Sequence, residues 1–264
     1  MPTSDFCEDN MNFCDEKIDD GVIVTEVNER IKIKELRGGH RFGSDAFLLS
    51  AFAKSTNGAA VELGSGSGVC SLLLADRNKA SHIFAVEIEP TLASLGKENF
   101  KENGFDGKIS SLNTDIRLLN TYSFDRSVTT VISNPPYFKA GAGRNSPNAV
   151  RNASRREING TIVDFCSAAA RILDKNGKFY CVFTAERLVD LISALRTAAL
   201  EPTTLVFVQH DDKNRPSIVL IEAAKEKKAP LLIPKPLVLF RDGNPTDDAA
   251  KIYETCDFGG FLNE

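Results

Sequence analysis

The chain has 264 residues, of which 26% are charged and 42% hydrophobic, and its formal net charge is −4. This length suits one large α/β domain with a short appendage, and the composition is ordinary for a globular protein. The negative net charge argues against indiscriminate binding of nucleic acid, so a nucleic-acid surface would have to be a local patch. No apolar run reaches the roughly 18 residues of a membrane-spanning helix, so we expect no membrane segment.

The first twenty residues are rich in Asp and Glu. A secretory signal would need basic and then apolar residues there, so we expect a cytoplasmic protein that begins with an acidic arm lacking a fold of its own. The cysteines show no C-x-x-C spacing, which favours buried free thiols over disulfides or a metal site. They are Cys7, Cys14, Cys70, Cys166, Cys181 and Cys256.

Apolar and polar residues alternate between Gly21 and Lys34, which predicts a hairpin. A helix is expected to follow, capped by Ser44 or Asp45 and ending near Ala53. An alternation of strands and helices then begins, which is typical of a mostly parallel sheet with helices on both faces. The predicted strands are 59–63, 82–87, 108–113, 128–133, 178–184, 203–209 and 216–223. The predicted helices are 68–77, 90–103, 161–173 and 185–198.

The fold class predicted from this order is α/β, with a mostly parallel seven-stranded sheet. Its last two strands are close in sequence, which predicts an antiparallel hairpin at one edge. Prolines break up the segment from Pro230 to Pro236, which we expect to be extended or irregular. The predicted organisation is an arm (1–20), a hairpin and helix (21–57), a main domain (58–240) and a tail (241–264).

A glycine-rich turn ends the first strand of this alternation, with Gly64, Gly66 and Gly68 at every second position. Glycines between a strand and a helix let a ligand approach the backbone. The dinucleotide pattern G-x-G-x-x-G fails at Val69, and no Lys-Ser or Lys-Thr follows to make a P-loop. Together with Glu62, the turn is similar to the first motif of Rossmann-like S-adenosyl-L-methionine-dependent methyltransferases. A purely structural turn is the alternative.

Acidic residues end or follow the next two strands. Glu87 can accept hydrogen bonds from two ribose hydroxyls, and Ile88 beside it would flank an adenine ring. Asp115 can accept a hydrogen bond from the adenine amino group of a cofactor, although a helix cap or turn explains it as well. Ile116 completes this predicted cofactor site. All these residues are expected at the carboxyl ends of strands, where open α/β sheets bind ligands.

An apolar strand, 128–132, leads into the sequence Asn134-Pro135-Pro136-Tyr137. Two prolines forbid helical continuation and keep the chain extended past the strand end. An amide side chain, a backbone carbonyl and an aromatic ring therefore share a stiff segment, which we call the ledge (134–137). A turn after a strand is the alternative reading of this tetrapeptide.

The ledge resembles the fourth motif of amino-methyltransferases, which modify the exocyclic amine of adenine or guanine or a glutamine amide. Such an amine is a poor nucleophile because its lone pair is delocalised. The Asn134 side-chain oxygen and the Pro135 carbonyl could accept its hydrogens and stabilise the developing positive charge. Tyr137 would stack on the target ring. Asn134 is also assigned to the cofactor site.

Five basic residues with no acid among them come after the ledge, which favours a phosphate-binding loop over ordinary surface charge. They are Lys139, Arg144, Arg151, Arg155 and Arg156. A second basic stretch runs from Arg30 to Arg41 and is diluted by Glu29 and Glu35.

Several segments together are similar to the bacterial tRNA1(Val) adenine-37 N6-methyltransferases over roughly residues 20 to 240. These segments are 41–49, 133–138, 153–157, 185–188 and 201–222. The resemblance implies S-adenosyl-L-methionine as methyl donor, S-adenosyl-L-homocysteine as product and the tRNA anticodon loop as substrate. It also implies that the loop containing Arg41 closes over the cofactor.

The sequence departs from that family at Glu62, where aspartate is commoner, although either acid can bond to the loop. It also departs at 183–185, where many relatives have a histidine. Two other amino-group substrates stay open, namely a glutamine of a peptide release factor and a guanine of ribosomal RNA. The non-enzymatic alternative is a module that binds RNA or a nucleotide without turnover.

Overall fold

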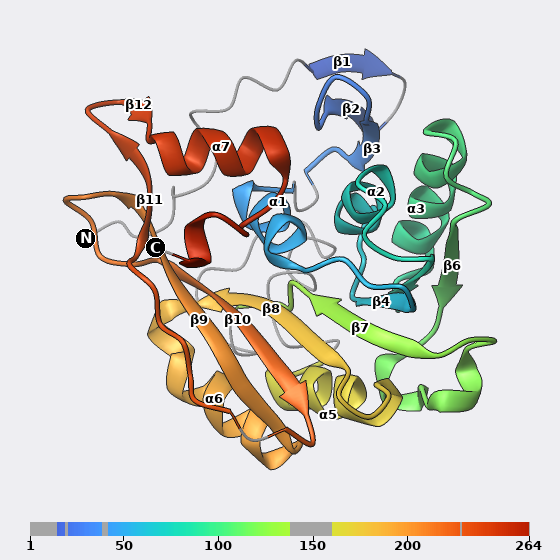
Figure 1. Cartoon of the computed structure of the whole chain (residues 1–264). Coiled ribbons are helices and arrows are strands. Elements are labelled where there is room, and N and C mark those ends of the chain that lie inside the picture. Colours follow the sequence, from blue (N-terminus) through green and yellow to red (C-terminus); the bar gives the residue numbers. More distant parts are fainter. Residues whose placement is uncertain (1–14, 19–20, 39–41, 138–159, 228, 264) are drawn as a thin grey trace.

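The structure is a computed structural model that describes residues 15–18, 21–38, 42–137, 160–227 and 229–263. A large sheet forms its centre (Figure 1). The strands of this sheet are β4 (Ala59–Leu63), β5 (His82–Glu87), β6 (Ile109–Asn113), β7 (Val128–Ser133), β8 (Lys178–Thr184), β9 (Leu200–Asp211), β10 (Ile218–Lys225), β11 (Leu237–Arg241) and β12 (Asn244–Pro245). Their spatial order is β12-β11-β9-β10-β8-β7-β4-β5-β6.

Parallel pairing dominates this sheet. The pairs β4–β5, β5–β6, β4–β7 and β7–β8 are all parallel, whereas β10 is antiparallel to both β8 and β9. The predicted α/β class and the antiparallel hairpin are therefore confirmed. The predicted count of seven strands is wrong, because β11 pairs in parallel with β9 and β12 pairs with β11, which extends the sheet to nine strands. The hairpin consequently does not form the edge.

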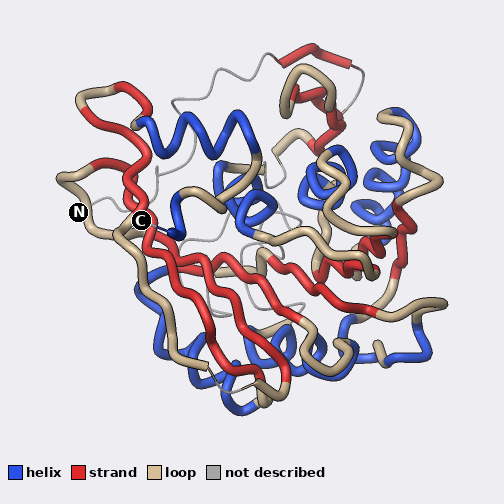
Figure 2. Tube along the Cα trace, in the orientation of Figure 1, coloured by secondary structure: helices blue, strands red, loops and turns tan. Residues whose placement is uncertain are grey.

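Helices cover both faces of the sheet, as Figures 1 and 2 show. One face carries α1 (Ser44–Phe52), α2 (Val69–Asp76), α3 (Pro90–Glu102) and α7 (Asp247–Thr255), and the other carries α5 (Ile162–Ile172) and α6 (Leu188–Thr197). Alternate strand residues face opposite sides, so Val131 and Ile132 of β7 belong to different apolar clusters. The apolar and β-branched residues on both sides of β7 are why this strand could be predicted as buried on both faces.

A second sheet lies beside α3 and consists of β1 (Asp15–Ile18), β2 (Val22–Glu26) and β3 (Lys32–Leu36). The antiparallel pair β2–β3 confirms the predicted hairpin. Residues 15–18 belong to the arm expected to lack a fold, yet they pair with β2. The side chain of Asn99 in α3 accepts from the Lys34 amide at 2.8 Å and donates to the Lys34 carbonyl at 3.0 Å, so it serves as a partner for the β3 edge.

The helix expected near 44–53 is present, but its predicted cap is wrong. Gly43 is the N-cap of α1 and makes no side-chain capping bond, while Ser44 and Asp45 lie inside the helix. The carboxylate of Asp45 is buried instead and reaches the ledge, as described below. A contact with a residue far along the chain therefore replaces the local capping role.

The predicted tail contains regular structure. Thr246 caps α7 by accepting from the Ala249 amide, and the helix packs its apolar side on α1, with the Phe47 and Tyr253 rings 4.9 Å apart. Farther on, Phe258 packs edge-on against Phe52 with ring centroids 5.5 Å apart. Residues 230–236 contain no helix or strand, as predicted, apart from a bridge between Leu232 and Thr204.

Two further observations concern the described residues alone. None of the helices in those ranges is long and apolar enough to cross a bilayer. The cysteines within the described ranges, Cys70, Cys166, Cys181 and Cys256, are buried free thiols.

We expect the C-terminal segment to be part of the main core. Phe258 is 1% exposed, so replacing it with alanine leaves a cavity and should lower the free energy of unfolding by about 3 kcal/mol. Denaturant unfolding measures this change. The matched control is Tyr122→Ala, because Tyr122 is 95% exposed and its removal should cost less than about 0.5 kcal/mol. A loss of similar size in both variants would mean that the segment contributes little to the core.

Candidate active site

The glycine turn and the ledge leave neighbouring strands at the same edge of the sheet. Leu63, the last residue of β4, is paired with Ser133, the last residue of β7, and the Ser133 hydroxyl donates to the Leu63 carbonyl at 2.9 Å. From β4 the chain continues to β5 on one side, and from β7 it continues to β8 on the other. Such a reversal of strand order opens a crevice at the carboxyl ends of the strands, where α/β sheets bind ligands.

The three glycines of the turn have positive φ angles of 74°, 53° and 90°, but their surroundings differ. A Cβ on Gly68 would lie 2.3 Å from the Phe100 ring, and one on Gly64 would lie 3.3 Å from the Phe165 ring. A Cβ on Gly66 would meet nothing within 4 Å. Gly64 and Gly68 are therefore required by packing within the chain, whereas Gly66 borders open space that a ligand could fill.

Glu87 ends β5 with its carboxylate turned toward the glycine turn. One oxygen accepts from the Gly66 amide at 2.8 Å and the other from the Glu89 amide at 2.9 Å. Burial raises the pKa of Glu87, and these backbone bonds oppose that rise. Each carboxylate oxygen can accept further hydrogen bonds, so the position suits two neighbouring hydroxyls. Ile88 follows it, half-buried, and its carbonyl accepts from Asn113 at 3.1 Å.

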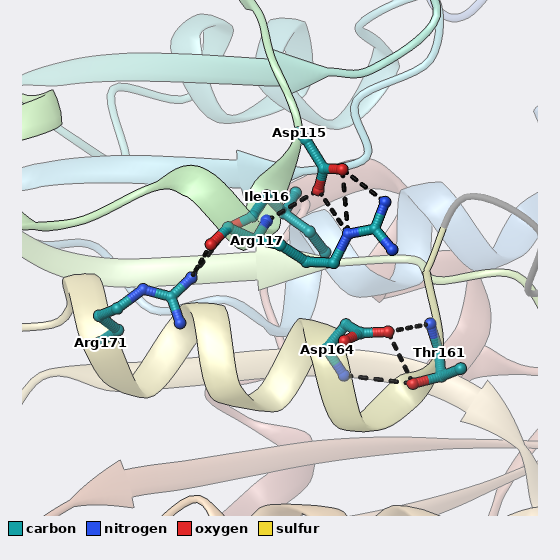
Figure 3. A network of polar contacts seen from close by, with 6 residues as sticks. All are labelled: Asp115, Ile116, Arg117, Thr161, Asp164 and Arg171. Carbon is teal, nitrogen blue, oxygen red and sulfur yellow. Dashed lines mark hydrogen bonds and ion pairs between the residues drawn. The ribbon is translucent and has the colours of Figure 1, made fainter.

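Asp115 and Ile116 form the next part of this edge (Figure 3). Asp115 caps the 3-10 turn η1 (Ile116–Leu118) by accepting from the Arg117 amide at 2.9 Å, which is the structural role left open above. The guanidinium of Arg117 also bonds to the Asp115 carboxylate and lowers its pKa. Ile116 is buried, and Arg171 of α5 donates to its carbonyl at 3.0 Å. The turn is thereby fixed to α5.

Figure 3 also shows the start of α5, where the described chain resumes after the ledge. The Thr161 hydroxyl accepts from the Asp164 amide at 3.3 Å, and the Asp164 carboxylate accepts from the Thr161 amide at 2.8 Å. This reciprocal capping satisfies two amides that the helix leaves unpaired, so the first turn of α5 is well defined beside η1.

The ledge is held from two sides. On one side the Asp45 carboxylate accepts from the Asn134 amide nitrogen at 3.1 Å and from the Tyr137 hydroxyl at 2.6 Å. On the other side Arg187 donates to the Tyr137 carbonyl at 2.9 Å, and its guanidinium lies 5.1 Å from the centre of the Phe183 ring. Pro135 is buried, while Asn134 and Tyr137 are half-buried.

Sequence reasoning missed Asp45 and left Arg187 without a role. Asp45 is a carboxylate directly before the apolar run of α1, which is also what a helix cap looks like. The signal that distinguishes the two roles is the partner, and Asn134 lies 89 positions away. Arg187 belongs to the short turn η3 (Ala185–Arg187), within a segment that carried the family resemblance.

Comparisons with known proteins identify the family of this chain. Residues 41–199 match the family described as methyltransferase small domain. The chain belongs to this family. It is accordingly an S-adenosyl-L-methionine-dependent methyltransferase, and the predicted fold class and cofactor are confirmed.

Proteins named tRNA1(Val) (adenine(37)-N6)-methyltransferase are among its relatives. The one from Flavobacteriaceae bacterium (strain 3519-10) is 26% identical over 70% of this chain and 84% of its own length. The one from Bacteroides fragilis (strain ATCC 25285) is 30% identical over 54% of this chain and 59% of its own length. A predicted O-methyltransferase from Agrobacterium tumefaciens has the same fold, with a TM-score of 0.65 and 20% identity over 81% of this chain and 97% of that one.

The hydrogen-bond partner of Glu62 in this methyltransferase differs from the expected one. Its carboxylate accepts hydrogen bonds from the amide of Ser71, at 2.9 Å, and from the hydroxyl of the same residue. We expected these bonds to go to the glycine turn, but they go to the first turn of α2. Burial, with a smaller contribution from the charge of Glu87, raises the pKa of Glu62 to about 7, and the hydrogen bonds from Ser71 oppose this rise. Glu62 therefore anchors α2 behind the turn, and its assignment to the cofactor site stays a prediction.

The remaining predicted residues lie outside the described ranges. They are Arg41, Lys139, Arg144, Arg151, Arg155 and Arg156.

We expect Gly66→Ala to separate binding from stability. Alanine at this positive φ costs about 1 kcal/mol of stability, and its methyl group would enter the open space beside Glu87. Affinity for S-adenosyl-L-methionine, measured by calorimetry, should fall by at least about tenfold, or about 1.4 kcal/mol.

The matched control for that substitution is Gly104→Ala, because Gly104 also has a positive φ and open surroundings but lies on the turn before β6. It should lose similar stability and bind the cofactor normally. Equal affinities in the two variants would show that Gly66 does not face the ligand.

The raised pKa of Glu62 predicts a pH-dependent stability difference. The unfolded carboxyl titrates near 4.5 and the folded one near 7, so the folded state favours the protonated form. The stability this provides is present below the lower value and is lost as pH rises through the higher one. Glu62→Gln cannot titrate. Its free energy of unfolding relative to the natural chain should therefore rise by about 2 kcal/mol from about pH 5 to about pH 8. A constant difference would contradict the raised pKa.

Proposed function

We propose that this methyltransferase transfers a methyl group to the N6 amine of an adenine in tRNA, within the anticodon loop, in the cytoplasm. The observation that carries the proposal is the pairing of Leu63 with Ser133, which brings the acceptors of the ledge beside the glycine turn. The names of the relatives support tRNA adenine as the substrate class. A single-stranded loop suits such chemistry because extruding a base costs least there.

The residues at this edge of the sheet fit the cofactor. A Cβ on Gly66 would meet nothing within 4 Å, so a ligand could approach the backbone there, and the buried Glu87 carboxylate beside it suits the ribose hydroxyls. Asp115 would accept from the adenine amino group, with Ile88 and Ile116 flanking the ring. When bound, S-adenosyl-L-methionine supplies a methyl group activated by a positively charged sulfur.

The ledge would act on the target amine through two oxygens. The Asn134 side-chain oxygen and the Pro135 carbonyl would each accept one hydrogen and favour a pyramidal nitrogen whose lone pair can attack. The dipoles of both groups would stabilise the positive charge that develops on that nitrogen. Tyr137 would stack on the base, and the fixed geometry would keep the amine in line with the methyl group. Deprotonation beforehand is not required, because the proton can leave after transfer.

A labelling assay tests this proposal. The protein is incubated with radiolabelled S-adenosyl-L-methionine and, separately, with unmodified tRNA, a peptide release factor or ribosomal RNA. We expect label in tRNA, recovered as N6-methyladenosine. Label only in the release factor, or only in ribosomal RNA as methylguanosine, would overturn the proposed substrate class. The proposed role of the ledge in methyl transfer to an amino group would still stand. No label in any substrate, despite cofactor binding, would favour a binding module.

The roles of two residues should separate in the same assay. Asn134→Ala should lower turnover by about 1,000-fold, because an acceptor for the amine is lost, and should change cofactor affinity only a few-fold. Glu87→Ala should mainly weaken cofactor binding. The matched control is Asn244→Ala, since Asn244 lies on β12, at the far end of the sheet order from β5. A large loss of cofactor affinity in Asn134→Ala would mean that its role is wrongly assigned.

A further inference from the structure

Three oxygen atoms meet where α1 touches the ledge. The Tyr137 hydroxyl oxygen lies 2.6 Å from an Asp45 carboxylate oxygen and 2.6 Å from the Asn134 side-chain oxygen. A phenol has one hydrogen, so it can donate to only one of these two acceptors at a time. The two acceptors therefore compete for the Tyr137 hydrogen, and the outcome decides whether the Asn134 oxygen is available to another donor.

The competition favours Asp45. Hydrogen bonds to an ionised carboxylate are roughly twice as strong as those to a neutral amide oxygen. The other Asp45 oxygen accepts from the Ala46 amide at 2.8 Å, at the start of α1, where the helix dipole stabilises negative charge. The side chain is 6% exposed, so solvent weakens the interaction little.

Asp45 also fixes the orientation of the Asn134 amide. The amide nitrogen donates to Asp45 at 3.1 Å, which turns the amide oxygen toward Tyr137. A flipped amide would place its oxygen against the carboxylate, with no hydrogen between them. The carboxylate therefore selects one of the two amide orientations, and that choice places the Asn134 oxygen beside the Tyr137 hydroxyl.

We propose that Asp45 is a positioning residue for methyl transfer. It holds the amide of Asn134 in one orientation and takes the Tyr137 hydrogen, which leaves the Asn134 oxygen free to accept a hydrogen from the target amine. This inference rests on the proposed transfer to an amine and assigns Asp45 no contact with substrate or cofactor. Asp45 lies on α1, far in sequence from the ledge, so the sequence motif of the ledge does not include it.

A double-mutant cycle tests this role. Asp45→Asn keeps an oxygen that can accept from the Asn134 amide but removes the charge that attracts the Tyr137 hydrogen. We expect kcat at saturating cofactor to fall at least about tenfold in the natural background. In the Tyr137→Phe background there is no hydroxyl to compete, so Asp45→Asn should cost less than about threefold. Equal losses in both backgrounds would overturn the proposal.

Two controls keep the result specific. Asp106→Asn removes an exposed charge on the turn before β6 and should leave kcat unchanged. Cofactor affinity and thermal stability are measured for every variant. An Asp45→Asn variant with normal kcat but tenfold weaker cofactor binding would make Asp45 a cofactor ligand and overturn the proposal. An Asp45→Asn variant that methylates tRNA with normal kcat and normal cofactor affinity would also overturn this proposal. The proposed function would then stand.

The cycle can be run on whichever substrate accepts label, since each candidate target is an amine or amide nitrogen. If release factor rather than tRNA is labelled, the proposed function fails while the coupling between Asp45 and Tyr137 can still be measured. If no substrate is labelled, both proposals are overturned.

Discussion

The parallel pairing of β4 with β7 is the constraint on which the site depends. It places Leu63 opposite Ser133, so the glycine turn and the ledge start from adjacent points. A second parallel pairing makes β5 the other neighbour of β4, which brings Glu87 to the turn from the opposite side. Three neighbouring strands of the sheet, β5, β4 and β7, therefore supply Glu87, the glycine turn and Asn134, respectively. Their relative positions are fixed by backbone hydrogen bonds, and long flexible side chains are not needed to bring them together.

Helix α1 adds a part that the sheet cannot supply, and its position depends on distant segments. Lys79 is buried and donates to three carbonyls at the end of α1, those of Ser50, Ala51 and Ala53, at 2.7–2.9 Å. Burial lowers the pKa of Lys79, so these dipoles must offset the cost of burying its charge. The C-terminal segment packs on the same helix through Tyr253 and Phe258. Contacts near both ends of α1, at Phe47 and at residues 50–53, therefore hold the helix that carries Asp45.

Local patterns predicted the elements of the sheet that surround the site. The strands 59–63 and 128–133 have the predicted bounds, because their mostly apolar or β-branched residues favour a buried strand. The C-terminal strand and helix were missed because prolines precede them and because α7 is polar over most of its surface. Asp45 was assigned as a cap, since an acid at a helix start has the same local pattern in both roles. Only the pairing of chain segments far apart in sequence distinguishes them.

Three buried acids, Asp45, Glu62 and Glu87, also shape the electrostatics of the site. Glu87 raises the pKa of Glu62, and both Glu62 and Asp45 raise the pKa of the Cys70 thiol, so the three carboxylates act on one region. Their described hydrogen bonds come from backbone amides, hydroxyls and an amide side chain, which stabilise negative charge without cancelling it. We expect such a region to attract a positively charged sulfonium more than a neutral thioether. Under the proposed role of Glu87 in cofactor binding, this negative charge would favour release of S-adenosyl-L-homocysteine after transfer.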